Sequence, residues 1–243
     1  MSKKDVEIHV GTSGWSYPDW KKTFYLEGLK PEDWLTFLST VFPTVEINTT
    51  FYHTPSESTI KGWFKKVPDD FIFSIKASRY ITHLKRLKEC KGAVKFFYSR
   101  IKLFKTKLGP ILFQLPPSFP ANKKTLNDFL KLLDYKYRYV FEFRHDTWFT
   151  EEYYKILRKH DIALCITDLN GKQTPEVITT DFTYLRLHGP HKSYEGSYGK
   201  TRLKKFKKKF VEWAEEGTSV YCYFDNDAKG DAAEDATTLI ELF

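Results

Sequence analysis

Short runs of β-branched and aromatic residues recur along the chain, and most are followed by a segment whose apolar residues return at helical spacing. Such runs predict strands, and the segments between them predict amphipathic helices. Between the sixth and seventh runs the pattern predicts only a loop or one short turn, over 169–181. The eight runs cover 6–12, 44–48, 71–76, 111–115, 139–144, 162–168, 182–188 and 219–225.

Strands that alternate with helices indicate a parallel sheet with right-handed crossovers. Eight such units in 243 residues match the closed (β/α)8 barrel, which typically has ~250 residues. The alternative is an open doubly wound sheet, but that fold usually has fewer strands, and no Gly-x-Gly-x-x-Gly loop follows the first run. We therefore predict an α/β protein with a single TIM-barrel domain over 1–243 and a site at the C-terminal mouth of the barrel.

Each predicted strand has one apolar face and one polar face, because side chains alternate across a strand. In the fifth strand, for example, Phe141 and Phe143 oppose Glu142 and Arg144. The apolar face must cover the helix layer, so we expect the polar face inside the barrel. This rule predicts an inward ring of polar side chains at the mouth: Glu46, Asn48, Lys76, Gln114, Glu142, Arg144, Asp168, Arg186, His188 and Asp225.

A polar ring is unusual inside a barrel, whose packed interior is normally aliphatic, and burying an unpaired charge costs several kcal/mol. The ring therefore indicates a binding and catalytic floor. The alternative is a structural ion network, because the four carboxylates nearly neutralise the three cations. Aromatic residues near the strand ends, among them Trp15, Tyr52 and Trp148, suit a sugar or a nucleobase, or simply fill the mouth.

The composition excludes intrinsic disorder, since 41% of the residues are hydrophobic and 17% are aromatic. No segment has the ~20 apolar residues of a bilayer-spanning helix, and no signal-peptide core follows Met1, so we expect a cytoplasmic protein that does not bind a membrane. The three cysteines are widely spaced and form no Cys-x-x-Cys, which argues against a disulfide framework or a structural zinc.

The formal net charge of +8 raises the question of nucleic-acid binding. The densest basic run, 200–210, places Leu203, Phe206 and Phe210 at helical spacing. Its lysines then form the solvated back of an amphipathic helix. The surplus is mostly lysine, whereas arginine suits bidentate phosphate contacts, so we favour a small-molecule ligand over nucleic acid.

Six sequence blocks occur in order along the chain: GTSGWSY at 11–17, VEINTTFY at 45–52, QLPPSF at 114–119, FEFRHDTW at 141–148, LRLHG at 185–189 and YFDND at 223–227. Together they resemble the YecE-like family, a domain of unknown function. The resemblance covers essentially the whole chain. It implies a TIM barrel related in shape to the xylose isomerase and endonuclease IV barrels, and it implies no particular reaction.

The ring is suited to general acid/base catalysis, which needs a carboxylate or histidine with a shifted pKa. We predict Glu142 or Asp168 as the base and His188 as the acid. Lys76, Arg144 and Arg186 would hold an anionic substrate or intermediate, and Lys76 could instead form a Schiff base. The other predicted substrate-binding residues are Ser13, Trp15, Glu46, Asn48, Tyr52, Gln114, Trp148, Asp225 and Asn226.

A divalent metal is the main alternative, held by Glu142, Asp168 and His188 with Glu46 or Asp225 nearby. Few histidines and three competing cations argue against it, so no metal ligand is assigned and no cofactor is firmly implied. Three functions stay open. The first is a hydrolase, lyase or isomerase acting on a small polar, anionic or sugar-like ligand. The second is a metal-dependent phosphodiesterase or nucleic-acid-binding protein, and the third is a non-catalytic ligand-binding barrel.

Overall fold

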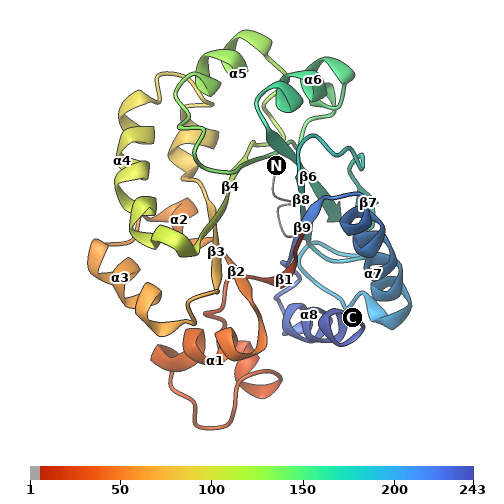
Figure 1. Ribbon diagram of the computed structural model, residues 1–243. Helices are drawn as coiled ribbons and strands as arrows, with labels where there is room; N and C mark the ends of the chain where they lie inside the picture. The colour runs from red at the N-terminus through yellow and green to blue at the C-terminus, as the bar shows by residue number, and fades with distance from the viewer. Residues whose placement is uncertain (1–5) are drawn as a thin grey trace.

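A computed structural model describes residues 6–243 and contains a closed barrel of eight parallel strands (Figure 1). The strands follow the order β5-β4-β3-β2-β1-β9-β8-β6, and pairing of β5 with β6 closes the sheet. The short strand β7 (Lys172–Gln173) pairs antiparallel with β6. The barrel strands are β1 (Ile8–Ser13), β2 (Thr44–Ile47), β3 (Ile72–Lys76), β4 (Leu108–Gln114), β5 (Tyr139–Glu142), β6 (Ile162–Leu169), β8 (Phe182–Leu187) and β9 (Ser219–Phe224).

Helices surround the strands on the outside of the barrel (Figure 1). The α-helices are α1 (Trp34–Val41), α2 (Thr49–Tyr52), α3 (Glu57–Lys66), α4 (Lys91–Ile101), α5 (Lys123–Leu130), α6 (Glu151–Lys159), α7 (Gly199–Glu215) and α8 (Asp231–Glu241). Short 3₁₀ segments lie at Pro18–Lys22, Pro31–Asp33, Lys102–Lys107 and Asp146–Trp148, and a π-helical turn lies at Tyr80–Leu84.

The predicted (β/α)8 barrel is confirmed. Each predicted run overlaps a barrel strand, and the bounds of the two differ by at most three residues. Between β6 and β8, where every residue is described, the chain forms the β7 hairpin and an extended segment instead of a helix, as the pattern over 169–181 predicts. The first residues, where we expected no signal-peptide core, lie outside the described range.

The interior of the barrel is packed near the N-terminal ends of its strands. A buried cluster there includes Leu112, Val140 and Phe182 together with several tyrosines. The Tyr223 hydroxyl lies 2.7 Å from the hydroxyl oxygens of both Thr44 and Ser74. This layer closes the lower part of the barrel, so the polar side chains nearer the C-terminal strand ends are accessible only from the mouth.

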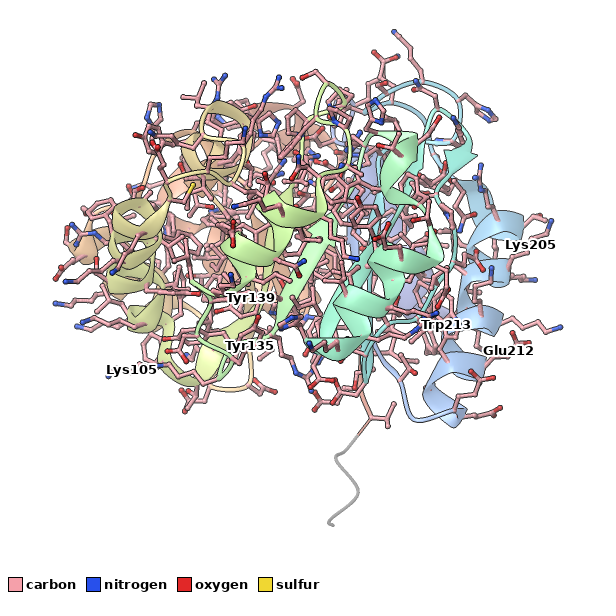
Figure 2. All side chains as sticks on the ribbon, turned by 90° about the horizontal axis from the view of Figure 1, so that it is seen from above. Lys105, Tyr135, Tyr139, Lys205, Glu212 and Trp213 are labelled. Atoms are coloured by element: carbon pink, nitrogen blue, oxygen red, sulfur yellow. The ribbon has the colours of Figure 1, made fainter. Side chains whose placement is uncertain are left out.

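Helix α7 is amphipathic, as predicted. Its apolar residues Leu203, Phe206, Phe210 and Trp213 are buried, whereas Lys205 projects from its outer side (Figure 2). No helix in the described chain is long and apolar enough to cross a membrane. The three cysteines lie within the described residues, and each is buried with a free thiol.

Candidate active site

Arg186 lies at the centre of the polar ring, projects inward from β8 and has a relative exposure of 0%. Its Nη2 atom is 2.8 Å from Glu46 Oε1 and 2.8 Å from Asp225 Oδ2, and its Nη1 atom is 3.1 Å from Glu142 Oε2. The three carboxylates come from β2, from the residue after β9 and from β5. One guanidinium therefore connects three separate walls of the barrel.

Glu46 is also held by neutral groups. The Tyr184 hydroxyl donates to its Oε2 atom at 2.6 Å, and the Ser13 hydroxyl donates to its Oε1 atom. Asn48 Nδ2 in turn donates to Ser13 Oγ at 2.5 Å. Both oxygens of Glu46 are thus occupied, so this carboxylate orients its neighbours and is not available to react. The predicted inward positions of Ser13, Glu46 and Asn48 agree with this geometry.

Glu142 is fully buried between two cations. Burial alone would raise the pKa of Glu142, but the Arg144 and Arg186 guanidinium groups hold it well below its ordinary value. Arg144 Nε donates to Glu142 Oε1, and Gln114 Nε2 donates to the same oxygen at 2.7 Å. Glu142 therefore stays ionised at neutral pH, which suits a positioning role better than the predicted role of general base.

His188 connects the network to the loop above it. Its Nδ1 atom lies 2.8 Å from Asp225 Oδ2, and its Nε2 atom lies 3.0 Å from Arg144 Nη2 and 3.1 Å from Arg186 Nη1. A guanidinium only donates, so we assign the proton to Nδ1 and an acceptor lone pair to Nε2. Burial and Arg186 lower the pKa of His188. The ring is then neutral. Its Nε2 atom is occupied by two guanidinium groups, whereas Nδ1 lies within ion-pair distance of Asp225 but without hydrogen-bond geometry. This arrangement does not favour the predicted role of general acid.

Asp168 does not join the ring, and this part of the prediction is wrong. It shares a strand face with Leu164 and Ile166, which belong to the apolar layer under the helices. Its carboxylate pairs with Arg202 of α7. The interior face of β6 carries Ala163 and Cys165, and Thr167, which follows them on that face, lines a cavity together with Arg144. The predicted inward position conflicts with the alternation of β6 itself, which places Asp168 on the same outer face as Leu164 and Ile166.

Trp148 is also misplaced by the prediction. It is fully buried, its ring is stacked on Phe143 with centroids 4.6 Å apart, and its Nε1 atom donates to the Phe119 carbonyl at 2.8 Å. The side chain therefore belongs to the hydrophobic layer outside the barrel. Neither face of the Trp148 ring is available for a ligand at the mouth to stack on.

Two further predicted ligand contacts lie outside the polar ring. Asn226 is buried, and its Nδ2 atom donates to Gly196 O and to Asp235 Oδ2, both at 2.8 Å. It anchors α8 to the loop after β8. Tyr52 has an exposed fraction of 64%, with its ring against Phe51.

Lys76 differs from the other ring cations because it is buried without an ion-pair partner. Its relative exposure is 9%, and its Nζ atom lies 4.5 Å from the centroid of the Phe51 ring. Among residues 6–243, no carboxylate forms an ion pair with it. Burial and the positive charge of Arg186 lower its pKa to about 8. A fraction of this amine is therefore neutral at physiological pH.

His83 is a neighbour of Lys76 that the strand pattern did not reveal. It lies in the π-helical turn after β3, and its ring meets Phe51 edge to face with centroids 4.9 Å apart. Burial and the charges of Lys76 and Arg79 lower its pKa to about 4, so the ring is neutral at pH 7. Because His83 follows the strand in a turn, its direction could not be read from alternation.

Asp227, two residues beyond Asp225, is a second site group that sequence reasoning missed. Burial raises its pKa to about 6, the Asp225 carboxylate adds to this shift, and the Tyr17 hydroxyl opposes it. That hydroxyl also lies 2.6 Å from the Ser13 carbonyl oxygen, and Trp20 Nε1 donates to the Asp227 carbonyl at 3.4 Å. Asp227 is therefore a half-buried carboxyl that titrates near neutrality, beside the residues after β1.

Two cavities open at the mouth. The first has a volume of about 320 Å³ and is lined by Trp15, Tyr17, Asn48 and Trp63 among others. The Oδ1 atom of Asn48 is buried and has no hydrogen-bond partner among the described residues. The second cavity, of about 350 Å³, lies beside Arg144 and Thr167. Aromatic rings beside an unpaired amide acceptor suit a polar ring compound with hydroxyl groups.

The residues at the mouth do not fit the alternative of a divalent metal held by Glu142, Asp168 and His188. Asp168 points towards α7, and Glu142 and His188 are both engaged by guanidinium groups. Within residues 6–243, no three His, Cys, Asp or Glu side chains are grouped as a metal-ligand set.

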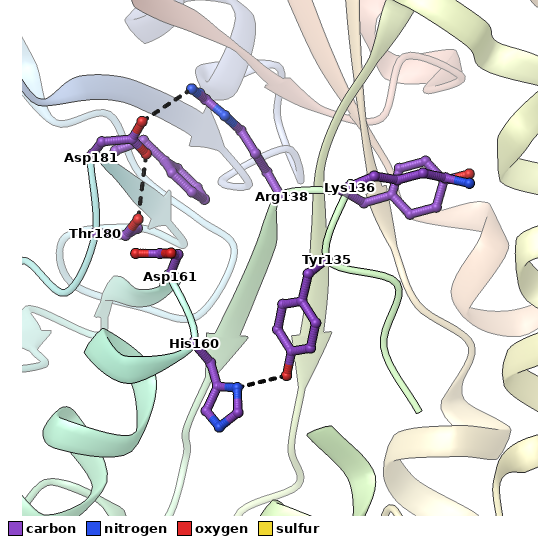
Figure 3. A pocket seen from close by; sticks show the side chains of 9 residues that line it. Tyr135, Lys136, Arg138, His160, Asp161, Thr180 and Asp181 are labelled. Atoms are coloured by element: carbon purple, nitrogen blue, oxygen red, sulfur yellow. Dashed lines mark hydrogen bonds and ion pairs between the residues drawn. The ribbon is translucent and has the colours of Figure 1, made fainter. Parts of the chain in front are cut away.

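A further cavity, of about 450 Å³, lies at the opposite end of the barrel, between the loops that precede β5, β6 and β8 (Figure 3). Its polar groups pair with one another. Tyr135 Oη lies 2.8 Å from His160 Nδ1, and Arg138 Nη2 lies 3.6 Å from Asp181 Oδ2. Active sites of this fold lie at the other end of the strands, so the mouth remains the candidate site.

Comparisons with known proteins agree with the fold. The chain is 24% identical to the UPF0759 protein YunF of Bacillus subtilis (strain 168), over 97% of this chain and 94% of that protein. It is 30% identical to the UPF0759 protein YecE of Escherichia coli (strain K12), over 59% of this chain and 51% of that protein.

Solved structures are also similar. A DUF72 family protein from Thermotoga maritima MSB8 superposes with a TM-score of 0.84 at 32% identity, over 97% of this chain and 98% of that one. A DUF72 family protein from Enterococcus faecalis V583 gives a TM-score of 0.82 at 19% identity, over 97% and 94%, which supports the fold alone. The family described as "Protein of unknown function DUF72" matches residues 9–243, and the chain therefore belongs to this family.

Proposed function

We propose that this protein is an enzyme that binds a small anionic, sugar-like molecule at the barrel mouth and acts on it by general acid/base chemistry. One observation carries the proposal: a largely buried lysine without an ion-pair partner among the described residues and a half-buried carboxyl next to Tyr17, which lines the aromatic cavity, lie at the same mouth. They are Lys76 and Asp227.

The anionic part of the ligand would contact Lys76 and Arg144. Arg186 is unsuited to this role, because three carboxylates already surround its guanidinium. Arg144 is only partly buried and lines the cavity beside β6. The Lys76 ammonium lacks a carboxylate within ion-pair distance in the described chain, so an anionic group supplied by a ligand would stabilise it.

Asp227 would transfer the proton. A general acid or base works best when its pKa lies near the operating pH, and Asp227, at about 6, meets that condition. Glu142 and Asp225, by contrast, have lowered pKa values and would remain ionised. The sugar-like part of the ligand would lie against Trp15 and Asn48 in the cavity of about 320 Å³.

The experiment is a binding screen with phosphate, sugar phosphates and sugar acids, read by thermal shift and then by calorimetry. We expect the wild type to bind at least one of these compounds. Lys76→Met should abolish that binding, whereas Asp227→Asn should bind but not turn the compound over. Lys205→Met, on the outer side of α7, is the matched control and should bind as the wild type does. Equal binding by Lys76→Met would contradict the proposal.

A further inference from the structure

We propose that Lys76 is a covalent catalytic residue that forms an imine with an aldehyde or ketone group of the ligand. This inference rests on the proposed function for the location of the ligand. It is carried by the surroundings of the Lys76 amine, which differ from those of the other deeply buried lysine described below.

Lys107 shows how a buried lysine is normally stabilised. Its relative exposure is 2%, and its Nζ atom donates to the Val67 carbonyl at 2.8 Å and to the Phe64 carbonyl at 3.0 Å, with Asp69 Oδ1 at 3.5 Å. These contacts give the Lys107 amine two carbonyl acceptors and a nearby carboxylate at the end of α3.

Lys76 lacks such contacts. Within the described chain, neither a hydrogen bond nor an ion pair within 4.0 Å engages its Nζ atom, which lies 4.5 Å from the centroid of the Phe51 ring. A group that is strongly hydrated in water therefore lies against an aromatic ring, at the last residue of β3 and towards the mouth. Lysines that act as nucleophiles are activated by desolvation or by an adjacent cation, and Arg186 supplies the second condition as well.

The consequence for reactivity is large. With a pKa of about 8, roughly a tenth of the Lys76 side chains carry a free amine at pH 7. An ordinary exposed lysine, with a pKa of about 10.4, has roughly one free amine in 2,500 at the same pH. The lone pair that attacks a carbonyl group is therefore available at Lys76 and scarce on the surface.

The step balances without any oxidant or reductant. The Nζ lone pair attacks the carbonyl carbon and forms a C–N bond, while the carbonyl π electrons move to oxygen. A proton passes from nitrogen to that oxygen and gives a carbinolamine. Solvent supplies a second proton to the hydroxyl, the C–O bond breaks, water leaves, and the nitrogen lone pair completes the C=N bond of an iminium. The iminium nitrogen loses its remaining proton to give the imine, so the proton taken from solvent is returned and the net change is amine plus carbonyl to imine plus water. His83, which packs against the same Phe51 ring and is neutral at pH 7, can relay that last proton to solvent.

The test uses glyoxylate, a small anionic aldehyde, followed by cyanoborohydride, which reduces an imine to a stable secondary amine. The full chain is treated at pH 7, digested and mapped by mass spectrometry. We expect the adduct at Lys76 to form at least ~10-fold faster than at the exposed Lys205, with Lys107 unlabelled. The Lys76→Arg variant, which keeps the charge but has no reactive amine, should lose the adduct at this position while its unfolding midpoint stays within a few degrees.

The result that overturns the inference is a labelling pattern that follows exposure, with Lys205 modified before Lys76. The proposed function is judged separately. If Lys76→Arg still binds the anions of the screen and the wild type forms no adduct at Lys76, the covalent step is wrong and the anion site remains. If the wild type binds no anion and is still labelled at Lys76, the covalent step stands and the choice of ligand is wrong.

Discussion

Arg186 and Glu46 form a bidentate ion pair inside the barrel, and both side chains have a relative exposure of 0%. Arg186 Nε lies 3.0 Å from Oε2, and Nη2 lies 2.8 Å from Oε1. Such a pair is often no more stable than an apolar replacement of both partners, but removing one partner leaves an uncompensated buried charge. The pair therefore makes the barrel sensitive to single changes at its centre.

Arg186→Met should destabilise the protein by about 3–5 kcal/mol at pH 7, because Glu46, Glu142 and Asp225 would lose their shared cation. The loss should be smaller at pH 5, because Arg186 lowers the pKa values of Glu142 and Asp225 in the wild type, and without it these two carboxylates take up protons more readily. Urea denaturation at the two pH values measures both effects. A loss below ~1 kcal/mol at pH 7 would show that the ion network does not support the fold.

Lys76→Met should change the free energy of unfolding in the opposite direction at pH 7. We expect the variant to be more stable than the wild type by roughly 1–3 kcal/mol. The wild-type pKa of about 8 lies below that of the unfolded chain, so between pH 8 and about 10.4 the unfolded state holds more protons. The free energy of unfolding of the wild type should therefore rise relative to that of the variant as the pH increases through this window. Urea denaturation at pH 7 and pH 9.5 compares the two proteins, and a variant that is less stable than the wild type at pH 7 would place Lys76 within the structural network.

Alternation along the strands predicted most of the barrel and the centre of the site. It placed Glu46, Glu142 and Arg186 inside correctly, because each lies in a strand whose apolar face is continuous. The prediction for Asp168 was wrong because it departed from this alternation, which places Asp168 on the same outer face of β6 as Leu164 and Ile166. Alternation does not extend to Asp227, which lies in a loop whose direction is set by tertiary contacts.

The same limit applies to residues beyond the strands. The aromatic positions near the strand ends could not be sorted by type, because a tryptophan suits a ligand and a core equally well. Trp15 lines a cavity at the mouth, whereas Trp148 is stacked on Phe143 in the apolar layer. Tertiary packing decides between them, and a single sequence carries no direct signal of that packing.

Arg202→Met should affect stability but not the site. Asp168 is buried, and Arg202 is the cation paired with it, so the variant leaves a buried carboxylate without that partner. We expect a loss of about 1–3 kcal/mol in urea denaturation. Asp168→Asn should bind the anions of the screen as tightly as the wild type, because its side chain faces α7. A large loss of affinity in Asp168→Asn would contradict this prediction and show that Asp168 contributes to the ligand site at the mouth.

Asp227→Asn should change the pH dependence of both stability and turnover. The folded-state pKa of about 6 is higher than the value near 3.9 of an unfolded aspartate, so between these two pH values the folded state holds more protons. Wild-type stability should therefore fall, relative to the variant, as pH rises from about 4 to 6. The Asn variant should lack this fall, which urea denaturation at pH 4 and pH 7 measures.

If Asp227 is the general base, kcat/KM should rise with pH and level off above about pH 6, where the carboxyl has lost its proton. The Asp227→Asn variant should lose about 10²–10⁴-fold in kcat while its affinity for the ligand stays within a few-fold of the wild type. Asp19→Asn, an exposed carboxyl in the segment after β1, is the matched control and should keep the wild-type profile. If Asp227 transfers the proton, the rise of kcat/KM near pH 6 should disappear in Asp227→Asn and persist in Asp19→Asn. A carboxyl with a purely structural role would instead lower kcat/KM by the same factor at every pH, and that result would contradict the prediction.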